Sequence, residues 1–408
     1  MGAGIIALPV KTFEAGFGPS SAVLCLAFAY MTLTALLLVE LSAAHPGANL
    51  SAMAFESLGA KGRAVAVGLY YFIYLATLTA YVAESGHFLS ALLRDFLGFP
   101  VPSAALSFLF TSWLSLVVCA GTRETEIVNR TCLAVALAAY ALLLAWGFRG
   151  LQDDRLARGS WGSAGPTLPL MVVAFTYHNI VPSLVGWLGS AREAARAVVL
   201  GGFVPLVMYV LWEAVILGSL PPDSAIGSAQ EVVRLLQDWL GPQVGPVVQL
   251  FSLFSIATSF LGVGLGCLDF MRDLLFGGGQ GGSSNSAGAR WGPGEQRALA
   301  LASMVLPALA LGLLCPGAFL VALDYSGTLR LLLFAVLPVL MVWRLRYREQ
   351  LEPWLPGGRL LLIAVLAIAA GVIGLELRAK LGLACSAVQA VGFSLATAAA
   401  VLVHLSYF

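Results

Sequence analysis

A series of long apolar runs occupies most of the 408 residues and restricts the chain to few kinds of fold. A helix that crosses the hydrocarbon core of a bilayer needs about 20 mostly apolar residues. The number of such runs predicts an all-α polytopic membrane protein. Residues 1–10 look like the second half of a further segment whose first half is absent. The windows that meet or nearly meet the length requirement are 19–43, 65–93, 103–121, 131–148, 167–188, 197–218, 244–271, 298–314, 317–343, 360–377 and 384–404.

Composition supports this class. Hydrophobic residues make up 59% of the chain and charged residues only 11%, whereas soluble domains have about 25% charged residues. With so few charged residues, most of the surface is expected to face the lipid bilayer. The net charge of +1 gives no electrostatic reason to expect a nucleic-acid partner. The six cysteines occur singly and without the spacing of metal ligands, so no metal or cofactor is predicted.

The segments are expected to form a single transmembrane transporter domain over 1–408, with its first segment truncated. Residues 277–294, rich in Gly and Ser, are expected to be a flexible linker on the cytoplasmic side. Residues 384–404 are expected to be an extra C-terminal segment, and 228–240 a short helix at the membrane interface. The larger share of the Lys and Arg residues lies in loops on the same side as 44–64, which predicts that this side faces the cytoplasm, or the equivalent stroma or matrix.

Two segments are interrupted in their middle. The first has Gly2, Gly4 and Pro9 within one short stretch, and the sixth has the polar run 176–179 followed by Pro182. Backbone that leaves the helix at membrane depth is tolerated only where protein or a watery cavity satisfies it. Interrupted segments at corresponding positions of two halves indicate a transporter binding site, and these two are five segments apart.

The interruptions predict which ligand would fit. A half-helix that begins near Ile5 would present free N–H groups and a positive dipole end to a carboxylate. Carbonyl groups around 175–177 could accept hydrogen bonds from an ammonium group, so a small amino acid is the expected substrate. The alternative stays open that Gly2 and Gly4 only allow close helix packing and that His178 is an ordinary buried histidine.

Several long motifs resemble the tyrosine/tryptophan permease family of the amino acid–polyamine–organocation superfamily. The resemblance runs in order from the first residue to about Leu377. The motifs are MGAGIIALP at 1–9, SLVVCAGTRETEIVNR at 115–130, TYHNIVPSLVGWLGS at 176–190, PLVMYVLWEAVILGSLP at 205–221, SIATSFLGVGLGCLDFMRDLL at 255–275 and PGAFLVALDYSGTLRLLLFAVLPVLMVWR at 316–344.

The resemblance implies a leucine-transporter-type fold with inverted five-helix repeats and broken first and sixth segments. It also implies proton-coupled uptake of tyrosine, tryptophan or phenylalanine. By motif, Ser255 joins the substrate site or, with Thr258 and Ser259, a coupling-ion site. The remaining substrate-binding residues that the resemblance implies are Gly2, Ala3, Gly4, Ile5, Phe175, Thr176, Tyr177, His178 and Asn179.

The sequence departs from the family pattern at two places. Bacterial relatives usually have Phe-His-Gly where this chain has Tyr177-His178-Asn179, which predicts a reshaped pocket. They also usually carry an Ala-Lys pair in the fifth segment, whereas 131–148 holds no Lys or Arg. A lysine there is a candidate substitute for a sodium ion, so the coupling ion stays open between a proton and sodium.

Ionisable residues within spans are functional candidates because their burial is costly. Glu84 shares a helix face with His87, and it is an outer gate, part of a solvated ion pair or part of a proton relay. Glu213 lies at the middle of the seventh segment and is either a proton site or a structural hydrogen-bonding group. Glu40, near the end of the second segment, is expected to extend to the membrane surface.

An aromatic substrate would need aromatic or polar contacts from a third helix. Tyr74, Thr77 and Tyr81 follow the i, i+3, i+7 spacing of one helix face in the third segment. They are candidate substrate contacts, although aromatic residues in membrane helices more often serve packing.

Two other functions compete with transport. A membrane-embedded enzyme could use His178, Glu213 or Glu84 as acid/base groups, but no clustered catalytic motif is present. An amino-acid sensor that binds without transport stays open. The high Ala, Gly and Leu content and the Tyr177-His178-Asn179 variant resemble plant or algal members of the family, for which a plastid envelope is expected. Otherwise a plasma or inner membrane is expected.

Overall fold

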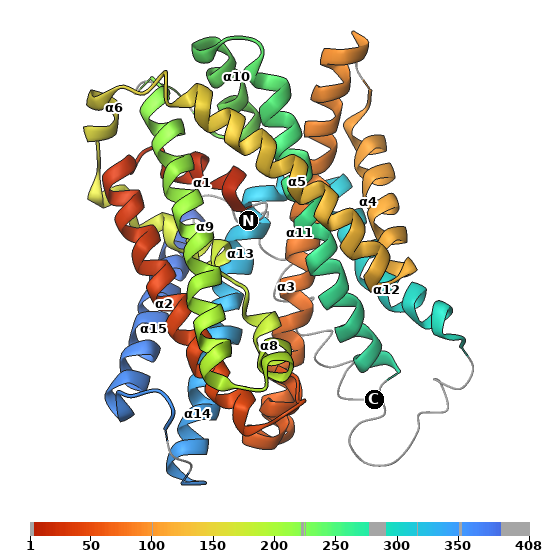
Figure 1. Cartoon of the computed structure of the whole chain (residues 1–408), viewed down its shortest axis with the longest axis vertical. Coiled ribbons are helices and arrows are strands. Elements are labelled where there is room, and N and C mark those ends of the chain that lie inside the picture. Colours follow the sequence, from red (N-terminus) through yellow and green to blue (C-terminus); the bar gives the residue numbers. More distant parts are fainter. Residues whose placement is uncertain are drawn as a thin grey trace. The chain divides into compact units, whose positions relative to one another are not determined.

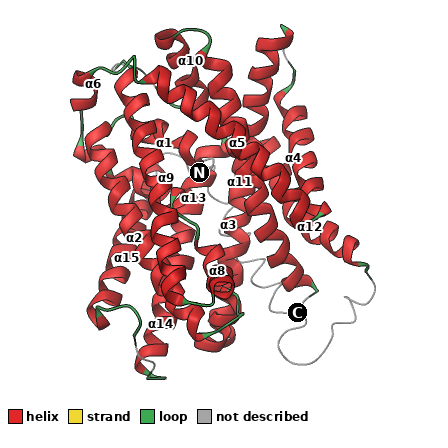
Figure 2. Ribbon diagram, in the orientation of Figure 1, coloured by secondary structure: helices red, strands yellow, loops and turns green. Residues whose placement is uncertain are grey.

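The structure, a computed structural model, consists of helices. It describes residues 4–99, 101–221, 224, 226–276, 291–315, 317–350 and 353–384. Figure 2 shows no strand in these residues, and an isolated antiparallel bridge joins Gly16 to Gly159. The all-α prediction is thus confirmed for the described chain. Gly2, Ala3, most of the 277–294 linker and residues 385–404 of the last predicted segment lie outside it.

Ten helical stretches within the described chain are long and apolar enough to cross a membrane. They coincide with the first ten windows predicted from the sequence, which confirms the polytopic membrane class. The stretches are α2 (Phe17–Ala44), α3 (Leu50–Leu97), α4 (Ser103–Ala120), α5 (Thr122–Gly147), the interrupted stretch Trp161–Leu188, α9 (Ala191–Ser219), α11 (Val244–Leu275), α12 (Pro293–Leu314), the stretch Phe319–Tyr347 and α15 (Gly358–Ala384).

Two of these stretches change their helical geometry along their length. Gly59 in α3 has φ 74° and ψ −166°, a conformation open to glycine, so residues 50–58 form a short helix before the long apolar part. The stretch Phe319–Tyr347 consists of α13 (Ala318–Leu331), the π-helical η5 (Leu332–Val336) and α14 (Leu337–Tyr347).

The described chain forms two compact units. Unit 1 comprises the residues up to Ala29 together with Phe72–Asn179 and Val199–Gly327. Unit 2 comprises Tyr30–Tyr71, Ile180–Val198 and the residues from Thr328 onward. The boundaries fall inside α2, α3, α9, α13 and the 3₁₀ turn η3 (His178–Ile180).

Helix α11 is the centre of packing in unit 1. It contacts α4, α5, α12 and the short helix α10 (Ala229–Leu240), and α5 lies beside it along much of its length (Figure 1). Tyr140, Trp212 and Phe251 form an aromatic cluster, with the Trp212 and Phe251 ring centroids 5.1 Å apart. Such ring pairs add stability beyond the apolar area that they bury.

A second group of contacts in unit 1 surrounds the start of the chain. Helix α1 (Gly4–Thr12) packs against α7 (Leu168–Ala174), α10 and the 3₁₀ turn η2 (Gly165–Thr167). The connection from α5 to η2 contains α6 (Asp153–Ala157) and the 3₁₀ turn η1 (Trp161–Ser163). Helix α1 is therefore held by elements from two distant parts of the sequence, 165–174 and 229–240.

In unit 2, η5, α14 and α15 pack together, and a buried ion pair joins α2 to α14. Arg346 donates to both carboxylate oxygens of Glu40, at 2.6 and 2.5 Å. The same carboxylate accepts from the backbone N–H of Leu355 at 3.0 Å, and Arg346 donates to the Leu355 carbonyl at 3.0 Å. Glu40 therefore does not extend to the surface as predicted, because a guanidinium from a distant segment satisfies it in the interior.

We predict that Arg346→Met destabilises the protein by about 3–5 kcal/mol, because it leaves the Glu40 carboxylate buried without a counter-charge. The double variant Glu40→Leu/Arg346→Met should recover part of this loss. Unfolding of the purified chain in detergent measures both effects.

The exposed pair Glu126–Arg130 on α5 provides the control. Glu126→Gln should cost no more than about 1 kcal/mol, since solvent screens that pair. An Arg346→Met variant as stable as the Glu126→Gln variant would contradict the role of the buried pair.

Candidate functional site

The sixth predicted segment is open in its middle. Helix α7 ends at Ala174, residues 175–177 are not helical, a 3₁₀ turn η3 (His178–Ile180) follows, and α8 (Val181–Leu188) begins at Val181. Pro182 lies in the first turn of α8, where a missing N–H has no cost. The opening lies where the polar run and the proline predicted it.

Side chains satisfy the carbonyl groups that the opening would leave free. In a regular helix the N–H of Thr176 would serve the carbonyl of Val172, but here it donates to Val173 O at 3.2 Å. The Thr176 hydroxyl donates to Val172 O instead, at 2.6 Å. Tyr209 of α9 donates to Ala174 O at 3.2 Å, which an unbroken helix would pair with the N–H of His178.

Aromatic rings surround the opening. Phe175 is buried and meets Phe28 and Tyr209 edge to face, with ring centroids 5.5 Å apart in both pairs. The Tyr177 ring stacks on His178 at 5.5 Å, and His178 is fully buried. Asn179 is exposed. The Tyr177 hydroxyl lies against α9 where Gly202 has no side chain, since a Cβ there would be 3.1 Å from it.

Helix α1 lies against the end of α7. A Cβ on Gly4 would be 3.6 Å from the Cα of Ala174, so the two helices approach closely at this point. Gly4 and Ile5 are buried at the start of α1. The structure thus brings the described part of the first predicted segment beside the opening of the sixth.

Two acidic residues meet the other end of α1. Thr12 Oγ1 lies 2.5 Å from Glu213 Oε2 of α9 and 2.9 Å from Leu8 O. Glu213 is buried, and its Oε1 has no hydrogen-bond partner among the described residues. The neighbouring Lys11 forms an ion pair of 2.6 Å with Asp324 of α13. The last turn of α1 is therefore linked to two carboxyl groups from different helices.

The candidate contacts on α3 are buried, but they face different neighbours. Tyr74 lies against α11, with its ring centroid 5.7 Å from that of Phe270. Thr77 Oγ1 is 3.2 Å from Ser326 Oγ of α13, and Tyr81 is buried as well. Glu84 accepts a hydrogen bond from Gln230 of α10.

The hydroxyl candidates on α11 mostly bond within their own helix. Thr258 and Ser259 donate to Ser255 O at 3.0 and 2.8 Å. The Ser255 hydroxyl is buried and has no partner among the residues that the structure describes. Ser255 is therefore the α11 candidate whose side chain is available to a ligand.

Several residues of this site carry no recognisable sequence signal. Tyr209, Thr12 and Lys11 belong to ordinary helical sequence, and only the fold brings them to the opening, to Glu213 and to Asp324. Asp324 is an ionisable residue within the predicted span 317–343, but the sequence does not indicate its pairing with Lys11. Within the described chain, no group of three or more His, Cys, Asp or Glu side chains is placed to hold a metal ion.

Apolar membrane helices, one of them opened at a polar run that contains the buried His178, are typical of membrane transport proteins. Comparison with known proteins narrows the class: the chain belongs to the tryptophan/tyrosine permease family, whose model matches residues 1–376. It is accordingly a permease and not an enzyme.

Similar proteins are found in bacteria. The chain is 29% identical to the "Tyrosine-specific transport system 1" of Haemophilus influenzae, over 94% of each chain. It is 27% identical to "Tyrosine-specific transport system 2" of the same organism, over 91% of each chain. A "Tryptophan-specific transport protein" of Pseudomonas aeruginosa is 28% identical, over 85% of this chain and 84% of that protein. These relatives give no support to the expected plastid envelope.

We predict that Tyr209→Phe destabilises the protein by about 1 kcal/mol, since it removes the donor to a carbonyl that the opened helix exposes. The ring contact with Phe175 stays in place. The melting temperature in detergent measures the effect.

Tyr140→Phe is the matched control. It removes a hydroxyl that donates to Met208 O at 2.7 Å, but that carbonyl lies inside the unbroken α9 and keeps its helical partner. Tyr140→Phe should therefore lower the melting temperature less than Tyr209→Phe does. Equal decreases would show that the hydroxyl of Tyr209 matters no more at the opening than one that bonds to an intact helix.

Proposed function

We propose that this permease carries an aromatic amino acid, namely tyrosine, tryptophan or phenylalanine, across a membrane by alternating access coupled to a proton. The observation that carries the proposal is the opening at 175–177, packed beside the start of α1. The printed names of the three relatives, two tyrosine-specific and one tryptophan-specific, support the substrate class.

The proposed fold is the leucine-transporter type, with two inverted repeats of five helices. Its support is the short α1 and the interrupted stretch α7–η3–α8, five segments apart. In such an arrangement the two discontinuous segments would hold the substrate near the middle of the membrane.

The proposed substrate site uses the polar groups of these two segments. The N–H groups of the first predicted segment, namely those of Gly2 and Ala3 together with those of Gly4 and Ile5 at the start of α1, would receive the substrate carboxylate. Carbonyl groups around Phe175 and Thr176 would accept from its ammonium group. Phe175, Tyr177 and His178, with Tyr74, Thr77 and Tyr81 from α3 and Ser255 from α11, would shape the pocket for the aromatic ring.

Glu213 is the proposed proton carrier. The Thr12 hydroxyl has one proton but lies within hydrogen-bonding distance of both Leu8 O and Glu213 Oε2. Both hydrogen bonds form together only when Glu213 is protonated and donates to Thr12. Loss of this proton would therefore change how α9 holds the end of α1, and so could link protonation to movement of α1. Sodium coupling through Thr258 and Ser259 is the second candidate.

The proposed location is the bacterial inner membrane, in keeping with the relatives. The side that carries 44–64 and most of the basic loops is expected to be cytoplasmic. The α5–α7 connection and α10 would then face outward.

Transport is tested by uptake and counterflow of radiolabelled tyrosine, tryptophan and phenylalanine in proteoliposomes, with glutamine as a non-aromatic comparison. Counterflow of an aromatic amino acid is the expected result. Binding without counterflow would identify a sensor instead. Imposed proton and sodium gradients, each alone, identify the coupling ion.

We predict that His178→Ala weakens binding of the transported amino acid about five- to 150-fold, which corresponds to one buried polar contact of about 1–3 kcal/mol. Leu143→Ala, a buried apolar change on α5, should instead lower the melting temperature and leave affinity nearly unchanged. A His178→Ala protein with normal affinity and markedly reduced stability would show that the histidine serves packing.

We predict that Glu213→Gln abolishes proton-driven accumulation but retains counterflow, because a glutamine can donate to Thr12 but cannot release a proton. Glu193→Gln, an exposed carboxylate on the same helix, should retain both activities. Accumulation driven by a proton gradient in the Glu213→Gln variant would exclude Glu213 as the carrier.

A further inference from the structure

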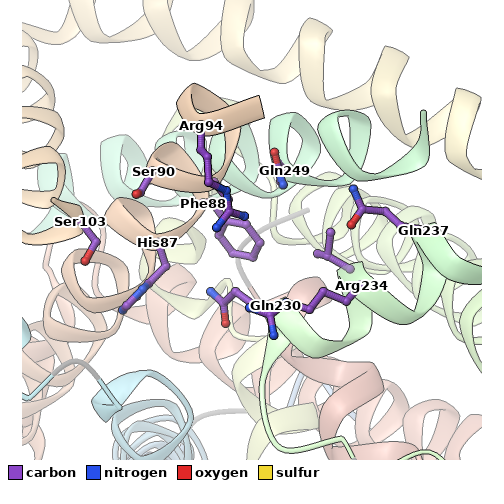
Figure 3. A pocket seen from close by; sticks show the side chains of 11 residues that line it. His87, Phe88, Ser90, Arg94, Ser103, Gln230, Arg234, Gln237 and Gln249 are labelled. Carbon is purple, nitrogen blue, oxygen red and sulfur yellow. The ribbon is translucent and has the colours of Figure 1, made fainter. Parts of the chain in front are cut away.

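A pocket of about 220 Å³ lies in unit 1, apart from the opened helix (Figure 3). Two helices contribute most of its polar side chains with the spacing of a single helix face. His87, Ser90 and Arg94 follow one another along α3, and Gln230, Arg234 and Gln237 follow one another along α10.

The position of α10 is well defined. Ser228 and Glu231 form a capping box at its start, and Val232, Val233 and Leu236 are buried on its apolar side. Gln237 lies against α11 at Gly245, where a Cβ would be 1.6 Å from the Gln237 amide nitrogen. The absence of a side chain at Gly245 therefore makes room for this polar residue.

The two arginines of the pocket are weakly engaged by carboxylates. Arg234 forms no ion pair or hydrogen bond with any described residue, and Arg94 forms a long ion pair with the adjacent Asp95, with 4.0 Å between Nε and Oδ1. The nearby carboxylates accept hydrogen bonds from amides: Asp95 from Gln249, and Glu84 from Gln230. Guanidinium groups in such a setting bind carboxylates through charge-assisted hydrogen bonds.

A buried acceptor lies in the same pocket. Gln249 of α11 is 4% exposed, and its Nε2 donates to Asp95 at 3.3 Å. Its Oε1 has no hydrogen-bond partner in the described part of the chain. A buried polar atom in this state is costly unless a ligand or water satisfies it. The pocket thus offers donors for a carboxylate and an acceptor for an ammonium group.

We propose that this pocket is a second binding site, which captures an amino acid through its α-carboxylate at Arg234 and Arg94 before the amino acid reaches the opened helix. The identity of the ligand rests on the proposed function. The pocket is smaller than typical small-molecule sites of about 300–1,000 Å³, which fits a single amino acid rather than a peptide. Because α10 also packs against α1, the ligand would contact a helix that touches the proposed substrate site.

Transport kinetics give the first test. Arg234→Gln should raise the apparent KM for tyrosine uptake by roughly three- to 30-fold, as expected for a partly exposed charge-assisted contact, with Vmax changed less than about twofold. Arg149→Gln is the control. Arg149 is an exposed arginine outside this pocket, and it precedes Gly150, whose carbonyl accepts from Trp239 of α10 at 3.2 Å. An unchanged KM in Arg234→Gln, or an equal rise in Arg149→Gln, would overturn the proposal.

A second test does not depend on transport. The variant Gln237→Cys is labelled with a charged thiol reagent in detergent, and peptide mass spectrometry follows residue 237 alone. Tyrosine, tryptophan or phenylalanine should slow the labelling at least about threefold, and tyrosine amide, which lacks the carboxylate, should not. Adding Arg234→Gln should remove the protection. Protection by the amide, or no protection by any of the three amino acids, would overturn the proposal.

An anionic lipid headgroup is the other source of a matching anion. Nanodiscs that contain phosphatidylglycerol and no amino acid should leave residue 237 reactive, and protection by this lipid alone would overturn the amino-acid assignment. Protection by an amino acid without transport would leave the pocket in place and refute the proposed function. Transport of an aromatic amino acid without protection of residue 237 would support the proposed function and refute the binding site in the pocket.

Discussion

Every backbone N–H and C=O within a bilayer must find a partner inside the protein, and the rest of this structure depends on how that requirement is met. Most segments meet it as continuous helices. The stretch from Ala174 to Val181 does not, and there Thr176 and Tyr209 supply the donors that the backbone lacks. The opened backbone is therefore stable only because these neighbouring side chains supply its hydrogen bonds. Such a place can offer polar groups to a ligand in an otherwise apolar interior.

The charged residues follow the same physical logic in two forms. Both carboxylate oxygens of Glu40 accept from Nε and Nη2 of Arg346, so this pair serves the structure of unit 2, and the buried Arg346 Nη1 has no hydrogen-bond partner among the described residues. Glu213 has one oxygen beside Thr12 and another without a described partner. Because the buried carboxyl group of Glu213 is only partly hydrogen-bonded, gain or loss of its proton can change the contacts of α1. This contrast separates a structural ion pair from a candidate coupling residue.

The pocket lined by α3 and α10 and the opened helix differ in the kind of binding that they favour. The opening offers backbone polar groups and aromatic rings, with few charged side chains nearby. The pocket offers two arginines and a buried amide oxygen in a place open to solvent. A charged, accessible site favours rapid capture, whereas an enclosed aromatic site favours selection. Helix α10, which lines the pocket and packs on α1, provides physical continuity between them.

Sequence alone determined the membrane class, the ten described spans, the family and the opening near 176–179, because hydropathy, Gly and Pro positions and local polar runs act over a few turns of one helix. It also singled out Glu213. Sequence could not show that Glu40 meets Arg346, that Tyr209 caps Ala174, or that Arg94 and Arg234 line one pocket. Those pairs join residues that are far apart in the chain. The sequence pattern of a helix shows which of its faces is polar, but not which neighbouring helix that face contacts. Only tertiary packing decides that partner.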